Sequence, residues 1–186
     1  MLYLSTKLYN IPLLSLRSAG RIGSVIKPII NPHNLHIDGF YCQVPGHKEN
    51  LILLDIHIRD LSPKGIIIDD NRDLSEPDEL VRLKPILKID FQILDKSVVS
   101  SKRKIGKLTE YAIDLKSMFI QKLYVQPAIW QSLNQQQLTF DRNSVIEVTD
   151  KHIIVSGPEE KATKTKKIPN SQAQVNYSAS TSLISE

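Results

Sequence analysis

The chain has 186 residues, a net charge of +4 and an apolar fraction of 41%, values typical of a globular protein. Its single cysteine, Cys42, excludes an internal disulfide and a multi-cysteine metal site, and it indicates a reducing compartment. No apolar run approaches the roughly 20 residues of a membrane span, and the first residues lack a signal-peptide pattern, so we expect a cytoplasmic protein.

Short alternating segments separated by turn signals predict strands in the first half of the chain. The expected strands lie at residues 2–8, 13–16, 21–30, 35–44, 51–59 and 66–68. The segment 51–59 alternates most clearly, with Ile52, Leu54, Ile56 and Ile58 on one face. Residues 31–34 read Asn-Pro-His-Asn, a strong turn signal, because Asn bonds to the local backbone and Pro fixes φ.

A short helix is expected at residues 78–83, between the two halves of the chain. Ser75 and Asp78 have the spacing of a capping box. The apolar side chains of the segment form one stripe, and Pro85 is expected to end or disrupt the helix. We expect the stripe to pack on one half of the protein or between both, and its residues are Leu80, Leu83 and Leu87.

The second half is predicted to contain strands as well. We expect them at residues 91–99, 105–113, 119–125, 138–140, 145–148 and 152–155, with a break at residues 95–96 and a turn at 114–117. From Gly157 the chain becomes charged and then polar with little bulk. Such a composition buries too little surface to offset the entropy of ordering, so the tail at 158–186 is expected to be disordered.

The second half also repeats the first. The stretch Arg21-Ile22-Gly23 recurs as Lys104-Ile105-Gly106 at an offset of 83 residues, and the same offset carries Arg59 onto Arg142. The last strand needs an offset of 87, which places about four extra residues near the end of the second copy. We therefore expect two small β domains, residues 1–87 with the linker helix and residues 88–157. Units this small gain from packing against each other.

The basic-Ile-Gly pattern, followed by a turn at Asn31 in one copy and at Asp114 in the other, resembles the start of a PRC-barrel domain. Residues 80–84 and 141–148 are also similar to parts of bacterial tandem PRC-barrel proteins, and the resemblance covers residues 5–156. It implies a mainly β fold, with two small, highly curved barrels in tandem joined by a short helical linker. Pro28 and Pro32 depart from the usual pattern.

The resemblance also implies a kind of function. Relatives include the C-terminal domain of the ribosome maturation factor, the H subunit of photosynthetic reaction centres and small archaeal cell-division adaptors. Their shared theme is docking on other macromolecules. The family brings no catalytic residues, so none is carried over to this chain.

The densest basic cluster of the sequence is the first candidate interaction site. It consists of Lys102, Arg103, Lys104 and Lys107, on a predicted turn, where it could contact RNA or an acidic partner. No aromatic residue interleaves with it to stack bases, so a solvated charged surface is the alternative. Trp130, near a predicted loop, is a second candidate, either as an interface anchor or as a cover for the open end of a barrel.

Other conspicuous residues have structural interpretations. Gly23 and Gly106 lie in no phosphate-binding motif, and we expect them at barrel corners where a side chain would clash. Arg59 and Arg142 are expected to pair with local carboxylates such as Asp60 or Asp141. No metal site is expected, because the spacing of Cys42, His33, His36, His47 and His57 does not suit zinc and residues 69–73 lack the frame of a calcium loop.

These observations favour a non-catalytic adaptor or scaffold that docks on a protein partner and needs no cofactor. A factor in RNA processing or ribosome assembly is the alternative, on an analogy of fold alone. An enzyme is disfavoured, because no catalytic triad, acid–base pair or cofactor loop stands out in the sequence. The sequence does not fix the oligomeric state.

Overall fold

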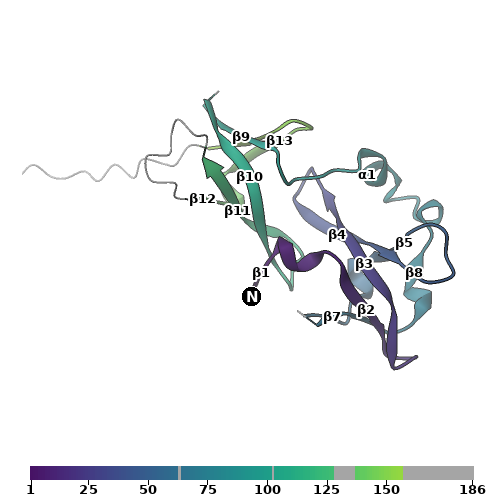
Figure 1. Cartoon of the computed structure of the whole chain (residues 1–186). Helices are drawn as coiled ribbons and strands as arrows, with labels where there is room; N and C mark the ends of the chain where they lie inside the picture. Colours follow the sequence, from purple (N-terminus) through teal and green to yellow (C-terminus); the bar gives the residue numbers. More distant parts are fainter. Residues whose placement is uncertain (63, 102, 128–136, 157–186) are drawn as a thin grey trace, which may run out of the picture.

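The computed structural model describes residues 1–62, 64–101, 103–127 and 137–156, which form two curled β-sheets with little helix (Figure 1). The predicted tail at 158–186 lies outside the described residues. The first sheet contains β2 (Ile11–Ser15), β3 (Gly20–Asn31), β4 (His36–Gln43), β5 (Leu51–Leu54), β6 (Asp60–Ser62), β7 (Gly65–Ile68) and β8 (Leu74–Ser75). The second contains β1 (Leu2–Leu4), β9 (Ser97–Ser100), β10 (Arg103–Asp114), β11 (Ile120–Pro127), β12 (Leu138–Asp141), β13 (Val145–Val148) and β14 (His152–Val155).

Six strands of each sheet follow the same spatial order. The order is β6-β7-β2-β3-β4-β5 in the first sheet and β13-β14-β9-β10-β11-β12 in the second. In both sheets one pair is parallel, β2 with β7 and β9 with β14, and the other neighbours along these paths are antiparallel. The repetition expected from the sequence is therefore confirmed as two curled sheets with one topology.

The turn after the long strand is built alike in both copies. Leu35 and Met118, which are 83 residues apart, both adopt a positive φ, 58° and 53°. The Leu35 N–H donates to Asn31 O at 2.9 Å, and the Met118 N–H donates to Asp114 O at 2.8 Å. The Asn31 and Asp114 side chains also accept backbone N–H groups of the turn, as residues of this type do.

The offset between equivalent residues of the two copies changes from 83 to 87 earlier in the chain than expected. Leu53 pairs with Phe40 in the first sheet, and Phe140 pairs with Leu123 in the second. The extra residues of the second copy therefore lie between β11 and β12, before the last strands. At the offset of 87, Arg142 corresponds to Asp55, and the predicted equivalence of Arg59 and Arg142 is wrong.

Two predicted strands end earlier than expected. In each, the chain changes direction in a 3-10 turn although the apolar alternation of the sequence continues. The strand expected at 51–59 stops at Leu54 and a 3-10 turn follows, so that Ile56 is 76% exposed instead of facing the core. The strand expected at 2–8 stops at Leu4, and Ser5–Leu8 forms another 3-10 turn. The strand expected at 91–99 is shorter as well, since only Ser97–Ser100 is a strand.

The N-terminal strand β1 belongs to the second sheet. Leu2–Leu4 pairs with the last three residues of β10, and the Ser5 hydroxyl accepts the Tyr111 N–H at 3.3 Å. The repeat assigns residues 1–87 to the first copy, yet this segment adds a strand to the second. Figure 1 shows β1 between the two sheets.

The linker helix begins later than expected. A 3-10 turn at Pro77–Glu79 precedes α1, which spans Lys84–Ile89. Pro85 lies in the first turn of α1, where its fixed φ suits a helix start, so it does not end the helix. The predicted cap at Ser75 is also wrong, because Ser75 lies in β8 and Glu79 instead accepts the Glu76 N–H at 3.0 Å.

The linker covers the outer face of the first sheet. Leu83, which is 9% exposed, packs with Ile29 and Ile52 in a small apolar cluster separate from the main core. Leu80 and Leu87 pack at its border. Of the two packing modes that the sequence left open, the structure therefore shows packing on one half.

A single apolar core joins the two sheets. It includes Phe40 and Ile68 of the first sheet together with Leu108 and Leu123 of the second, all inaccessible to solvent. Leu8, between β1 and β2, is buried in the same cluster. The expected packing of the two copies against each other is confirmed. Among the described residues, no helix is both long enough and apolar enough to cross a membrane.

Leu83→Ala is expected to lower the free energy of unfolding by about 2 kcal/mol, the low end for a large-to-small change at a buried leucine. The melting temperature in thermal denaturation measures this loss. Because α1 packs on the first sheet, the radius of gyration in solution scattering should stay unchanged. Val81→Ala is the control, since Val81 is 73% exposed. Equal melting temperatures for the two variants would contradict the packing of the linker.

Candidate functional site

The two sheets meet at a joint with approximate two-fold symmetry. The Ile37 N–H donates to Met118 O, and the Ile120 N–H donates to Leu35 O, both at 2.9 Å. These four residues form two pairs related by the offset of 83, so each copy contributes the same two positions. His36 and Phe119, related by the same offset, form the antiparallel bridge between the two hydrogen bonds.

Side chains from both copies pack over this joint. The His36 ring meets the Phe119 ring edge to face, with the centroids 4.7 Å apart. The Arg142 guanidinium lies 4.0 Å from the Phe119 centroid, and its Nη2 donates to Asn34 O at 2.9 Å. Arg142 therefore connects the second sheet to the turn of the first, and it forms no pair with Asp141.

Two carboxylates flank His36 on the first sheet. Its Nδ1 lies 2.8 Å from Asp38 Oδ1, and its Nε2 lies 3.7 Å from Asp55 Oδ2. Burial raises the pKa of Asp55, although the nearby His36 opposes the shift. Sequence reasoning considered His36 only as a metal ligand. Over the residues that the structure describes, no group of three or more His, Cys, Asp or Glu side chains is placed to hold a metal ion.

A groove of about 350 Å³, which we call the junction groove, lies beside the joint. The turn Pro32–Leu35 of the first sheet forms one wall, and Arg142, Asn143 and residues 145–148 of the second sheet form the other. Ile146 lines the groove and is 69% exposed. The groove thus places an exposed apolar side chain near a fixed arginine.

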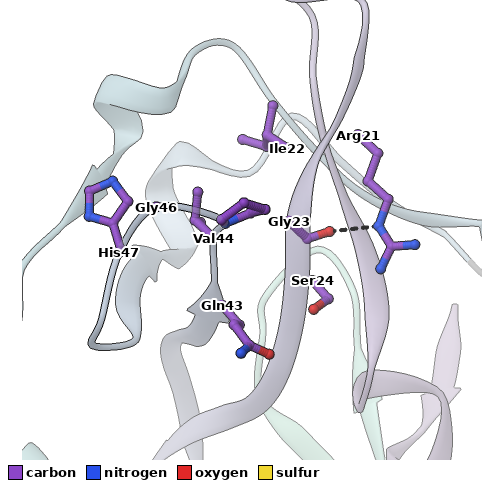
Figure 2. Close-up of a pocket in the computed structure, with 9 residues that line it drawn as sticks. Arg21, Ile22, Gly23, Ser24, Gln43, Val44, Gly46 and His47 are labelled. Atoms are coloured by element: carbon purple, nitrogen blue, oxygen red, sulfur yellow. Dashed lines mark hydrogen bonds between the residues drawn. The ribbon is translucent and has the colours of Figure 1, made fainter.

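A second pocket, of about 390 Å³, lies in the first sheet at Gly23. It is lined by Arg21–Ser24 of β3 and by residues 43–47 after β4. Figure 2 shows Arg21 and His47 on opposite sides of β3, with Arg21 Nε donating to Gly23 O at 3.0 Å. The two basic side chains therefore do not converge on one ligand position.

Gly23 and Gly106 are required by a close approach of two strands. A Cβ atom added at Gly23 would overlap Gln43 O, and one added at Gly106 would overlap Gln126 O. The two glutamines are again 83 residues apart. The glycines thus let β3 approach β4 and β10 approach β11 in equivalent places.

The outer face of the second sheet is a further candidate surface. Along β11 the fully buried Leu123 and Val125 alternate with Tyr124 and Gln126, which point away from the core. On β10, Lys107 pairs with Gln126 across the strands. Among the described residues, no helix covers this face of the second sheet in the way that α1 covers the first sheet.

The described residues of the predicted basic cluster all lie on β10. Arg103 and Lys104 are exposed at the start of β10, and Lys107 lies further along the same strand. Lys102 and Trp130 lie outside the described residues. Sequence reasoning found no aromatic residue near the cluster, because Tyr124 reaches this face only through the pairing of β10 with β11.

Arg59 and Arg142 have other partners than expected. Arg59 pairs with Asp69, and this interaction holds the pKa of Asp69 below its usual value. Asp141 pairs with Lys122 at 2.7 Å. The expectation that the arginines pair with Asp60 and Asp141 is therefore wrong. Arg59 does contact a carboxylate, but one ten residues away in the chain.

The fold and these surfaces define a duplicated, mainly β protein whose notable sites are grooves and sheet faces. Comparison with protein-family models and with curated proteins finds no match for this chain. The resemblance to tandem PRC-barrel proteins therefore rests on the sequence motifs alone.

Proposed function

We propose that this protein is a non-catalytic adaptor, built from two PRC-barrel-like units, that docks on a protein partner through the junction groove. The observation that carries the proposal is the joint. Reciprocal backbone hydrogen bonds and a common core hold the two sheets together, so both walls of the groove keep a fixed spacing. A surface that is ordered before binding loses less conformational entropy when the partner docks.

The chemistry of the groove supports this role. Ile146 offers apolar area, and Arg142 is held in place by Asn34 and by the Phe119 ring. Arginine is enriched among the residues that dominate binding energy at protein interfaces, and anchors of this kind lie within well-packed surroundings. The turn Pro32–Leu35 lines the same groove as Ile146 and Arg142.

Ile146→Asp is expected to abolish the capture of a protein partner, because it places a charge on the apolar part of the groove. The measurement is affinity capture with the full chain from native cell extract, quantified by mass spectrometry. Val81→Asp is the matched control, since Val81 is 73% exposed in the linker. A partner retained equally by both variants would place the docking surface elsewhere.

A role in RNA processing or ribosome assembly is the second candidate, and the outer face of the second sheet favours it. That face combines Lys107 with Tyr124. Nuclease treatment of the extract separates the two candidates. Ribosomal proteins lost from the captured material after treatment would favour the second, and a partner that persists would favour the adaptor.

A further inference from the structure

We propose that the outer face of the second sheet, formed by Lys104, Lys107, Lys122, Tyr124 and Gln126, binds single-stranded nucleic acid. This inference goes beyond the proposed protein docking, and it gives the second candidate role in RNA processing a ligand class and a site. The junction groove and this face use different residues, so the two sites can be tested separately.

Strand geometry brings the residues together. Lys107 lies opposite Gln126, and Glu110 lies opposite Tyr124, on neighbouring strands. The register shifts at a bulge between Leu108 and Glu110. Residues on adjacent pairs of one face lie within reach of long side chains, so the ammonium group of Lys107 can reach the surroundings of the Tyr124 ring.

The charges on this face favour a polyanion. Three lysines, Lys104, Lys107 and Lys122, lie on this face of β10 and β11, and the acidic residues of the same strands and of β12 include Glu110 and Asp141. Glu110 accepts the Thr6 hydroxyl at 2.9 Å, and Asp141 pairs with Lys122 at 2.7 Å. Outside the Lys122–Asp141 pair, two lysines therefore accompany one carboxylate on this face, and residues 88–157 carry a net charge of +3.

Comparison with the first sheet indicates that an apolar helix would fit the outer face of the second sheet poorly. In the first sheet the outer face is apolar, and α1 covers it through Leu83, Ile29 and Ile52. At the equivalent places the second sheet has Ala112 and Thr139. A small and a polar residue offer little to an apolar helix, so a second helix-like partner fits this face poorly.

A nucleic acid strand can use each of these groups. Bases stack on aromatic rings regardless of sequence, and lysines along the backbone neutralise phosphates. Tyr124 supplies the ring, Lys107 and Lys104 supply the charges, and the Gln126 amide can bond to base edges. A duplex keeps its bases stacked inside, so the face should prefer single strands.

The test is fluorescence polarisation with a labelled oligouridylate of about 12 nucleotides, a length within the usual site size. We expect the full chain to bind it at low salt and to bind an RNA duplex of equal length more weakly. Tyr124→Leu should weaken binding about tenfold, which corresponds to the loss of one stacked base. Lys107→Ala should weaken it too and reduce the slope of log affinity against log salt by about 0.7.

Lys48→Ala is the control, since Lys48 is exposed in the loop after β4. Thermal melting of each variant checks that it is folded. Absence of binding at low salt, equal effects of the Lys48 and Lys107 variants, or equal affinity for the duplex would each overturn the inference. Ile146→Asp should leave oligouridylate binding unchanged. If the oligonucleotide does not bind while protein capture persists, only the nucleic-acid inference fails.

Discussion

Gly106→Ala is expected to lower the free energy of unfolding by about 3 kcal/mol, the upper range for overpacking. The added Cβ would overlap the backbone oxygen of Gln126 on the neighbouring strand β11. That oxygen cannot move away without separating β10 from β11, the pair that carries much of the second sheet. Urea denaturation followed by circular dichroism measures the loss.

Two further glycines provide the comparison. Gly23→Ala should be similarly destabilising, because its Cβ would overlap Gln43 O in the first sheet. Gly20→Ala should stay within about 0.5 kcal/mol of the parent, since the nearest atom to its Cβ is Ser18 O at 3.7 Å. If all three variants unfold at the same urea concentration, the close approach of the strands does not determine stability.

The strands and the repeat could be predicted because their signals are local. In β4 and β11 the buried side chains alternate with polar ones, as Phe40 and Cys42 do in the first copy and Leu123 and Val125 in the second. The basic-Ile-Gly motif marks equivalent places in β3 and β10. A period of two and a recurring glycine therefore identified the two sheets without any knowledge of the pairing.

Corners and long-range pairing could not be predicted in this way. Ile56 continues the alternation of β5 but lies beyond its end, because a curled sheet must turn and alternation carries no signal for the turn. The pairing of β1 with β10 joins residues more than 100 positions apart, such as Leu2 and Asp114. An apolar strand of three residues does not specify which edge it joins.

The candidate sites depend on the same long-range contacts. His36 and Phe119 occupy matching positions in the repeat, so the sequence contained the symmetry of the joint but not the reciprocal hydrogen bonds across it. Arg142 was matched to Arg59 because the insertion was placed too late in the second copy. Strand register, which shows Arg142 at the position of Asp55, corrects this.

Stability is expected to fall between pH 9 and pH 12 because of Cys42. Its side chain is fully buried in the shared core, and burial raises the pKa of the thiol from 9.0 to about 12. In the unfolded chain the thiol ionises near its ordinary pKa, so rising pH stabilises the unfolded state first. The thiol therefore leaves the free energy of unfolding unchanged below pH 9. As the pH rises toward 12, the free energy of unfolding falls by about 1.4 kcal/mol per pH unit.

Cys42→Val isolates this contribution, because valine is similar in size and does not titrate. Burial also raises the pKa of Tyr111 and Tyr3, but these groups titrate alike in both proteins. From pH 8 to pH 10.5 the parent should lose about 2 kcal/mol more than Cys42→Val, as measured by urea denaturation at each pH. Equal losses would mean that Cys42 ionises in the folded protein near its ordinary pKa. The core between β4 and β5 would then admit water, and the two sheets would not enclose the continuous core on which the fixed joint depends.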